Sequence, residues 1–211
     1  MLCLIAMLSM LIDHIGYKLD IDILRIIGRL AMPIYAYFIV QGYHKTHNVK
    51  KYVFKVLAVA LASQILFYRF TGKNVLNICF LWVLGLLWLH ISYKNKGFSK
   101  FCLQFIIIIA ALYIPVEYGL IGLLWVILWD KYFYDESIKI ICICVIGLLV
   151  LPLLAGDLIQ IFAMAAVPVV VWCRLNDTER FNNRVLNKLV WSFFYPMQFV
   201  ILNEVFILLK K

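Results

Sequence analysis

Long apolar segments run through almost the whole chain, and they restrict its possible folds more than any other feature. Hydrophobic residues make up 65% of the 211 residues, whereas a soluble domain contains about 45–50%. A helix needs about 20 apolar residues to cross the hydrocarbon core of a bilayer, and several runs approach that length. We therefore expect an all-α, polytopic transmembrane helix bundle in the cell membrane.

Polar loops divide these runs into about nine helices, several of them short. Gly16 is expected to end the first helix, and no repeat or second domain is visible, so residues 1–211 form a single domain. The polar stretch 174–188 is expected to hold a short surface helix. The expected helices cover residues 1–15, 23–42, 52–70, 76–93, 101–114, 118–129, 140–154, 158–173 and 189–209.

Lysine and arginine are distributed unevenly between the two sides of this arrangement. With the N-terminus inside, the inner loops hold twelve of them and the outer segments hold six. The positive-inside rule then predicts a multi-pass protein with a cytoplasmic N-terminus and an external C-terminus. The net charge of +9 thus reports orientation in a lipid bilayer, and we expect no nucleic-acid partner.

The cysteines lie mostly within apolar runs and are interpreted as buried free thiols. Because no spacing with histidine is typical of metal ligands, we expect no metal. The six cysteines are Cys3, Cys79, Cys102, Cys142, Cys144 and Cys173.

Asp13 and His14 place an acid and a base side by side in the first apolar segment. An ionisable residue at membrane depth costs roughly 2.5–3.5 kcal/mol on insertion scales, so the pair is a candidate functional site. The alternative is that this segment is only the polar end of a helix whose side chains extend to the interface. In the predicted orientation both residues lie towards the outer side.

Two further segments carry candidate binding residues. Arg25 and Arg29 lie four residues apart on one helix face, where they either pair with a carboxylate or bind a phosphate. The loop 42–52 is basic and hydroxyl-bearing, which fits either positive-inside topology or contacts to a phosphate of a nucleotide-like cofactor. The candidates in this loop are Thr46, Asn48, Lys50 and Lys51. Glu117, near an outer helix end, is interpreted as an interfacial residue.

Several short motifs resemble the TraX family when they are taken together and in order. The resemblance spans most of the chain, and each motif alone is weak. The motifs are Asp13-His14-Ile15-Gly16, the segment 24–37 with Gly28-Arg29 and Met32-Pro33, the loop 42–52, Asn74-Val75, Tyr118-Gly119 with Gly122, and Phe194-Tyr195-Pro196.

That family includes the membrane N-acetylase of conjugative pilin. The resemblance implies transfer of an acetyl group from cytosolic acetyl-CoA, used as a cosubstrate, to an unknown amine or hydroxyl acceptor on a protein N-terminus, peptide or glycan. His14 matches the catalytic position of the family's first helix, and Tyr118, Tyr195 and Gln198 are expected near the substrate. The chain departs from the family pattern at Gln41, Gln64, His47 and Gln198, where Glu, Glu, Arg and His are usual.

The residues themselves fit this chemistry. Transfer from a thioester needs a base and stabilisation of an oxyanion. His14 is the expected base, with its tautomer set by a nearby carboxylate or backbone carbonyl, and Asp13 or Asp20 is the candidate carboxylate. Two alternatives remain: a proton-coupled small-molecule transporter in which Asp13 and His14 relay protons, and a membrane scaffold without chemistry.

Overall fold

Helices account for nearly all of the computed structural model, which describes residues 1–134, 148–150, 153, 156–176 and 193–208. The all-α prediction is confirmed, and only one isolated bridge, Leu76 with Val116, joins extended backbone in the described part of the chain. The helices are α1 (Leu2–Leu19), α2 (Asp22–Gly28), α3 (Ala31–Lys45), α4 (Val49–Thr71), α5 (Ile78–Lys94), α6 (Gly97–Tyr113), α7 (Gly119–Tyr134), the 3₁₀ helix η1 (Leu158–Ala165), α9 (Ala166–Leu175) and α11 (Tyr195–Leu208).

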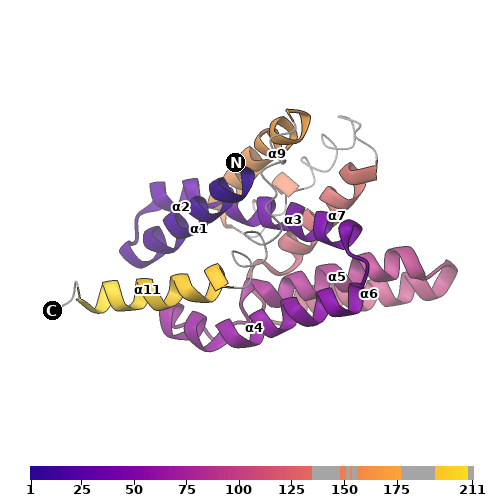
Figure 1. Cartoon of the computed structure of the whole chain (residues 1–211), viewed down its shortest axis with the longest axis horizontal. Coiled ribbons are helices and arrows are strands. Elements are labelled where there is room, and N and C mark those ends of the chain that lie inside the picture. Colours follow the sequence, from indigo (N-terminus) through magenta and orange to yellow (C-terminus); the bar gives the residue numbers. More distant parts are fainter. Residues whose placement is uncertain (135–147, 151–152, 154–155, 177–192, 209–211) are drawn as a thin grey trace.

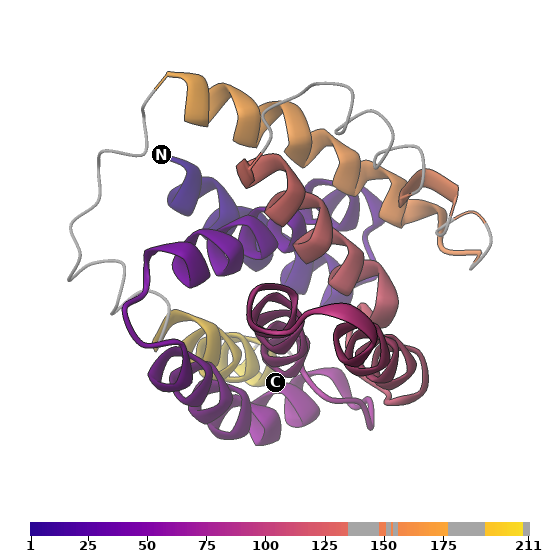
Figure 2. The same ribbon diagram turned by 90° about the vertical axis from the view of Figure 1, so that its right-hand side faces the viewer.

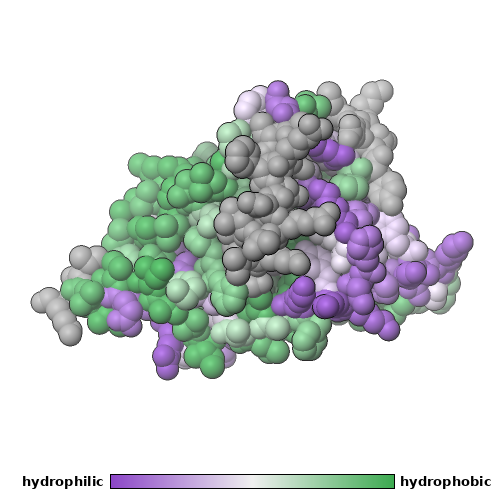
Figure 3. Space-filling model, in the orientation of Figure 1, coloured by the Kyte–Doolittle hydropathy of each residue, from purple (hydrophilic) through white to green (hydrophobic). Residues whose placement is uncertain are grey.

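Four stretches are long and apolar enough to cross a membrane: Leu2–Leu19, Asp22–Lys45, Val49–Thr71 and Leu158–Leu175. The helices Ile78–Lys94, Gly97–Tyr113 and Tyr195–Leu208 are apolar but shorter. On the face shown in Figure 3, the left half is mainly hydrophobic, and hydrophilic residues gather on the right.

The bundle has two layers. In the lower layer of Figure 1, α4 packs against α5 and α11, and α5 packs against α6. In the upper layer, α1 packs against α2 and α3, and α3 packs against α7. Figure 2 shows η1 and α9 at the top of the upper layer. The core includes Trp125 and Trp129 of α7, which are fully buried, and Trp129 packs on Tyr37 of α3.

Three helix boundaries differ from the sequence prediction. Gly16 does not end the first helix, which continues to Leu19 and is capped by Asp20 in the left-handed conformation. The single helix expected over 23–42 is two helices that meet at Arg29 and Leu30. Pro33 helps to explain this break, because it has no N–H to bond the carbonyl of Arg29. Within 158–173, the first eight residues are a 3₁₀ helix.

Other predicted helices agree with the structure to within a few residues, as with 52–70 and α4, which has an Asn48 side-chain cap at its start and Gly72 at its end. Most of the predicted helix 140–154, the short helix expected within 174–188, and the start of 189–209 lie outside the described residues.

Candidate functional site

Two glycines bring α1 and α2 into direct backbone contact. A Cβ atom at Gly28 would overlap the Cβ of Asp13, and one at Gly16 would lie 2.7 Å from the Cβ of Leu24. Small residues at these crossings let the antiparallel helices approach closely. The contact places the carboxylate of Asp13 directly against Arg25 of α2 and against Arg29, the residue that follows the helix.

Asp13 is paired with both arginines. Its Oδ2 lies 3.2 Å from Nη1 of Arg25, and its Oδ1 lies 3.3 Å from Nη2 of Arg29. The side chain of Arg29 is only 4% exposed, and that of Asp13 is 11% exposed. Of the two alternatives left open by the sequence, the structure therefore shows carboxylate pairing for these arginines.

His14 is oriented by Gln198 and not by a carboxylate, which corrects the expectation that Asp13 or Asp20 would be its partner. The Nδ1 atom of His14 lies 3.2 Å from Oε1 of Gln198 on α11. Because an amide oxygen only accepts, Nδ1 carries the proton in this arrangement and Nε2 keeps its lone pair. The rings of Phe70 and Phe199 enclose the imidazole at centroid distances of 5.7 and 4.9 Å.

The connection between α6 and α7 completes the site. The carbonyl of Pro115 accepts a hydrogen bond from Leu76 N, and Glu117 N donates to the carbonyl of Leu76. This pairing holds Tyr118 in the left-handed region at φ 64°, a strained conformation for a bulky residue and one that is concentrated at functional sites. The hydroxyl of Tyr118 consequently lies 2.6 Å from Nη1 of Arg29.

Two cavities meet at this cluster. The larger, of about 1460 Å³, runs to the end of α3 and the start of α4. The smaller, of about 240 Å³, is lined by Tyr17, Arg25, Thr71 and Lys73 among others. Four residues line both cavities and so stand between them: Asp13, His14, Glu117 and Tyr118.

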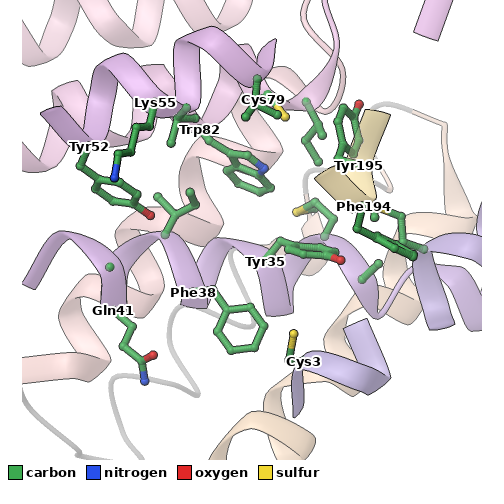
Figure 4. A pocket seen from close by; sticks show the side chains of 18 of the residues that line it. Cys3, Tyr35, Phe38, Gln41, Tyr52, Lys55, Cys79, Trp82, Phe194 and Tyr195 are labelled. Carbon is green, nitrogen blue, oxygen red and sulfur yellow. The ribbon is translucent and has the colours of Figure 1, made fainter. Parts of the chain in front are cut away.

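The larger cavity changes in character along its length. Lys45, Thr46, Asn48, Lys51 and Lys55 line it where α3 gives way to α4. Figure 4 shows Lys55 and Tyr52 of α4 at one end, Tyr195 and Phe194 at the other, and Tyr35 and Trp82 between them. The cavity thus joins a basic region to His14 through a mostly apolar interior that includes Tyr35, Phe38 and Trp82.

The predicted cofactor residues separate into two groups. Thr46, Asn48 and Lys51 line the larger cavity, and the side-chain oxygen of Asn48 also caps α4 by accepting from Lys51 N. Lys50 is exposed and lines neither cavity. Arg25 lines only the smaller cavity and Arg29 lines neither.

The predicted substrate residues all lie at the cluster or in the larger cavity. Tyr118 lines both cavities, Tyr195 lines the larger one, and Gln198 contacts His14. The sequence interpretation did not select Lys55 as a binding residue and treated Glu117 as interfacial, although both line the larger cavity. Lys55 follows Lys51 by one helical turn, so the i, i+4 rule indicates the same face. No local signal distinguishes Glu117 from an interfacial acid.

Gln64, one of the departures from the family pattern, stabilises the connection between α4 and α5. Its Nε2 donates to the carbonyl of Val75, and its Oε1 accepts from both nitrogens of Asn77. An ionised Glu could not make the first of these bonds. Gln41 instead lines the larger cavity, and its Nε2 lies 3.5 Å from the hydroxyl of Tyr37.

The end of α3 is anchored by a polar network. Asp130 Oδ1 lies 2.9 Å from His44 Nε2 and accepts a hydrogen bond from the hydroxyl of Tyr93. The His44 ring also stacks on Phe133 of α7. These contacts fix His44, which directly precedes Lys45 and Thr46 in the lining of the larger cavity.

The carboxylate of Glu117, unlike its backbone N–H, makes no hydrogen bond or ion pair with any residue that the structure describes. Burial, reinforced by the neighbouring Asp13 carboxylate, raises the pKa of Glu117 to about 7, against the opposing effect of Arg29, Arg25 and Lys73. Folded protein then binds a proton that the unfolded chain has already lost, and folding stability falls as pH rises from about 4.5 to about 7.

The substitution Glu117→Gln should remove the fall in folding stability with rising pH, because glutamine does not titrate. We expect the melting temperature of the variant in detergent to exceed that of the wild type at pH 8 by roughly 5–10 °C and to approach it at pH 4.5. Glu204→Gln, at an exposed carboxylate on α11, is the matched control. Equal melting curves for wild type and Glu117→Gln at both pH values would contradict the assignment.

Comparison with known proteins shows which family the chain belongs to. A profile described as TraX protein matches residues 1–206. A curated relative, the uncharacterized protein RP591 of Rickettsia prowazekii (strain Madrid E), is 27% identical over 145 residues, which are 68% of this chain and 52% of the relative. The chain thus matches about half the length of that relative. No solved structure matches. With the profile covering nearly the whole chain, the resemblance seen in the sequence motifs is confirmed, and the chain belongs to the TraX family.

Proposed function

We propose that the protein is a membrane-embedded acetyltransferase that moves an acetyl group from cytosolic acetyl-CoA to an amine or hydroxyl acceptor. The observation that supports this most directly is the position of His14. It stands where two cavities meet, and the larger of them extends to a basic region. A donor and an acceptor that enter from different sides would meet at this imidazole.

The larger cavity suits acetyl-CoA in size and in lining. Pockets for small ligands are typically about 300–1,000 Å³, and this one, at about 1460 Å³, is larger. The ammonium groups of Lys45, Lys51 and Lys55 supply charge-assisted donors for phosphates. The apolar interior suits the less polar arm that carries the thioester towards His14.

The chemical step uses His14 as the general base. Its Nε2 takes the proton from the acceptor as the acceptor's N or O bonds to the thioester carbon. The C–S bond then breaks, and His14 returns the proton to the departing sulfur of CoA. Gln198 holds the required tautomer through Nδ1, and the Asp13 carboxylate, paired with two arginines, contributes to the local field.

Access follows from the charge distribution. The N-terminus and the basic region at Lys45–Lys55 face the cytoplasm, where acetyl-CoA is available. The smaller cavity lies on the other side of His14 and admits the acceptor, which is a protein N-terminus, a peptide or a glycan at or across the membrane.

The same geometry favours one other function, a proton-coupled transporter. Two cavities separated by His14 and Glu117 resemble the midplane arrangement of a carrier with a proton relay. The two functions are distinguished by reconstituting the protein in liposomes. Consumption of acetyl-CoA with an added acceptor supports the enzyme, and proton-driven uptake without acetyl-CoA consumption supports the carrier.

Replacing Lys51 and Lys55 by alanine should raise the KM for acetyl-CoA. Each charge-assisted contact contributes about 1.5–3 kcal/mol, so we expect a rise of about tenfold or more for the double variant, with kcat largely retained. The measurement is CoA release in nanodiscs at varied acetyl-CoA. Lys50→Ala is the matched control, because this lysine is adjacent but lines neither cavity. An unchanged KM in the double variant would place the phosphates elsewhere.

A further inference from the structure

The hydroxyl of Tyr118 is held in an unusual way. Its oxygen lies 2.6 Å from Nη1 of Arg29, and a guanidinium only donates hydrogen bonds. The tyrosine oxygen is therefore the acceptor in this contact. Arg29 itself is 3% exposed and is fixed on its other side by Asp13, so the donor cannot swing away from the tyrosine.

This contact leaves the proton of the Tyr118 hydroxyl directed away from Arg29. No acceptor for it occurs among the described residues, and the side chain lines both cavities. Accepting a bond from a cation also polarises the O–H group and strengthens it as a donor. Burial raises the pKa of Tyr118 above its usual range, so the hydroxyl keeps its proton at physiological pH.

The backbone supports the same interpretation. Tyr118 adopts a φ of 64°, in the left-handed region that is unfavourable for a bulky residue. The bridge between Leu76 and Val116 and the hydrogen bond from Glu117 N to Leu76 O hold the segment in place. The strained, fixed backbone holds the polarised Tyr118 hydroxyl at the junction of the two cavities. The hydroxyl is therefore a preorganised hydrogen-bond donor.

We propose that Tyr118 donates a hydrogen bond to the thioester oxygen of acetyl-CoA and stabilises the oxyanion that forms during transfer. This inference rests on the proposed acetyltransferase function. As the acceptor bonds to the carbonyl carbon, the C=O electron pair moves onto oxygen, and it returns when the C–S bond breaks. Tyr118 forms no covalent bond, and Arg29 is a positioning residue that acts through it.

Tyr118→Phe should lower kcat for acetyl transfer about 10²–10³-fold, as removal of an oxyanion donor does in other enzymes. The KM for acetyl-CoA should change less than about threefold, because the basic region that binds phosphate is untouched. The assay is CoA release with glycinamide or glucosamine in nanodiscs. Tyr68→Phe, at an exposed tyrosine on α4, is the control and should match the wild type.

A spectroscopic test separates donation from a structural role. The carbonyl stretch of bound acetyl-CoA labelled with ¹³C at the thioester should move to lower frequency in the wild type relative to water, and move back in Tyr118→Phe. Replacement of Tyr118 by 3,5-difluorotyrosine keeps the hydroxyl and the fold, and its more acidic proton should lower the frequency further.

The outcomes are distinguishable. Wild-type protein that neither binds nor consumes acetyl-CoA overturns the proposed function, and this inference with it. A wild type that turns over, together with Tyr118→Phe within about threefold of its kcat, overturns only the inference. The same holds if the carbonyl frequency is equal in wild type and in both Tyr118 variants.

Discussion

His14→Ala is expected to lower the rate of acetyl transfer about 10²–10⁴-fold, the usual effect of removing a general base. The affinity for CoA should stay close to that of the wild type, because Lys55, one of the proposed phosphate contacts, lies at the opposite end of the larger cavity from Tyr195. Tyr195 begins α11, the helix whose Gln198 contacts His14. If His14 had only a structural role, the His14→Ala variant would lose CoA binding and stability together with activity.

The measurement is CoA release with an added amine, alongside CoA binding by calorimetry in the same nanodiscs. His90→Ala is the matched control, since this histidine of α5 lines neither cavity and should leave transfer unchanged. Near-wild-type turnover in His14→Ala would show that His14 is not the general base.

Asp13→Ala should have the largest effect on stability. It leaves Arg29 buried without its carboxylate, and breaking a buried ion pair in this way costs about 3–5 kcal/mol. For a chain of this size, the melting temperature should fall by roughly 10 °C. Thermal unfolding in detergent, followed by tryptophan fluorescence, measures the change.

A second substitution tests the reason for this loss. Arg29→Met in the Asp13→Ala background removes the unpaired charge, so part of the lost stability should return. Acetyl transfer should remain low in the double variant, because Tyr118 no longer has its donor. Asp22→Ala removes an exposed carboxylate and should change the melting temperature little. A double variant no more stable than Asp13→Ala would show that the loss comes from helix packing.

Local signals in the sequence predicted much of the fold and the part of the site that lies in the first two expected helices. Apolar run length located the helices because each helix satisfies its own backbone within one segment. The cost of burying charge identified Asp13 and His14, and the four-residue spacing placed Arg25 and Arg29 on one face. The break at Arg29 and Leu30 was missed, although Pro33 marks it.

The rest of the site depends on contacts between distant segments. Gln198 reaches His14 from 184 residues away, and Tyr118 reaches Arg29 across 89 residues. Neither pairing leaves a local pattern, because a single glutamine or tyrosine near a helix end is common at a membrane interface. The left-handed backbone at Tyr118 likewise depends on the bridge to Leu76.

The sequence by itself determined that the chain is a helical membrane protein of the TraX family, with an acid and a base near the end of its first helix and two arginines near the start of the second. Only the tertiary structure decided which groups meet. Close approach of the helices at Gly16 and Gly28 brings Asp13 into contact with the arginines. The packing of α11 on α4 places Gln198 next to His14. Run length and spacing are properties of one segment, whereas the partner of a buried polar group is set by whichever distant segment packs against it.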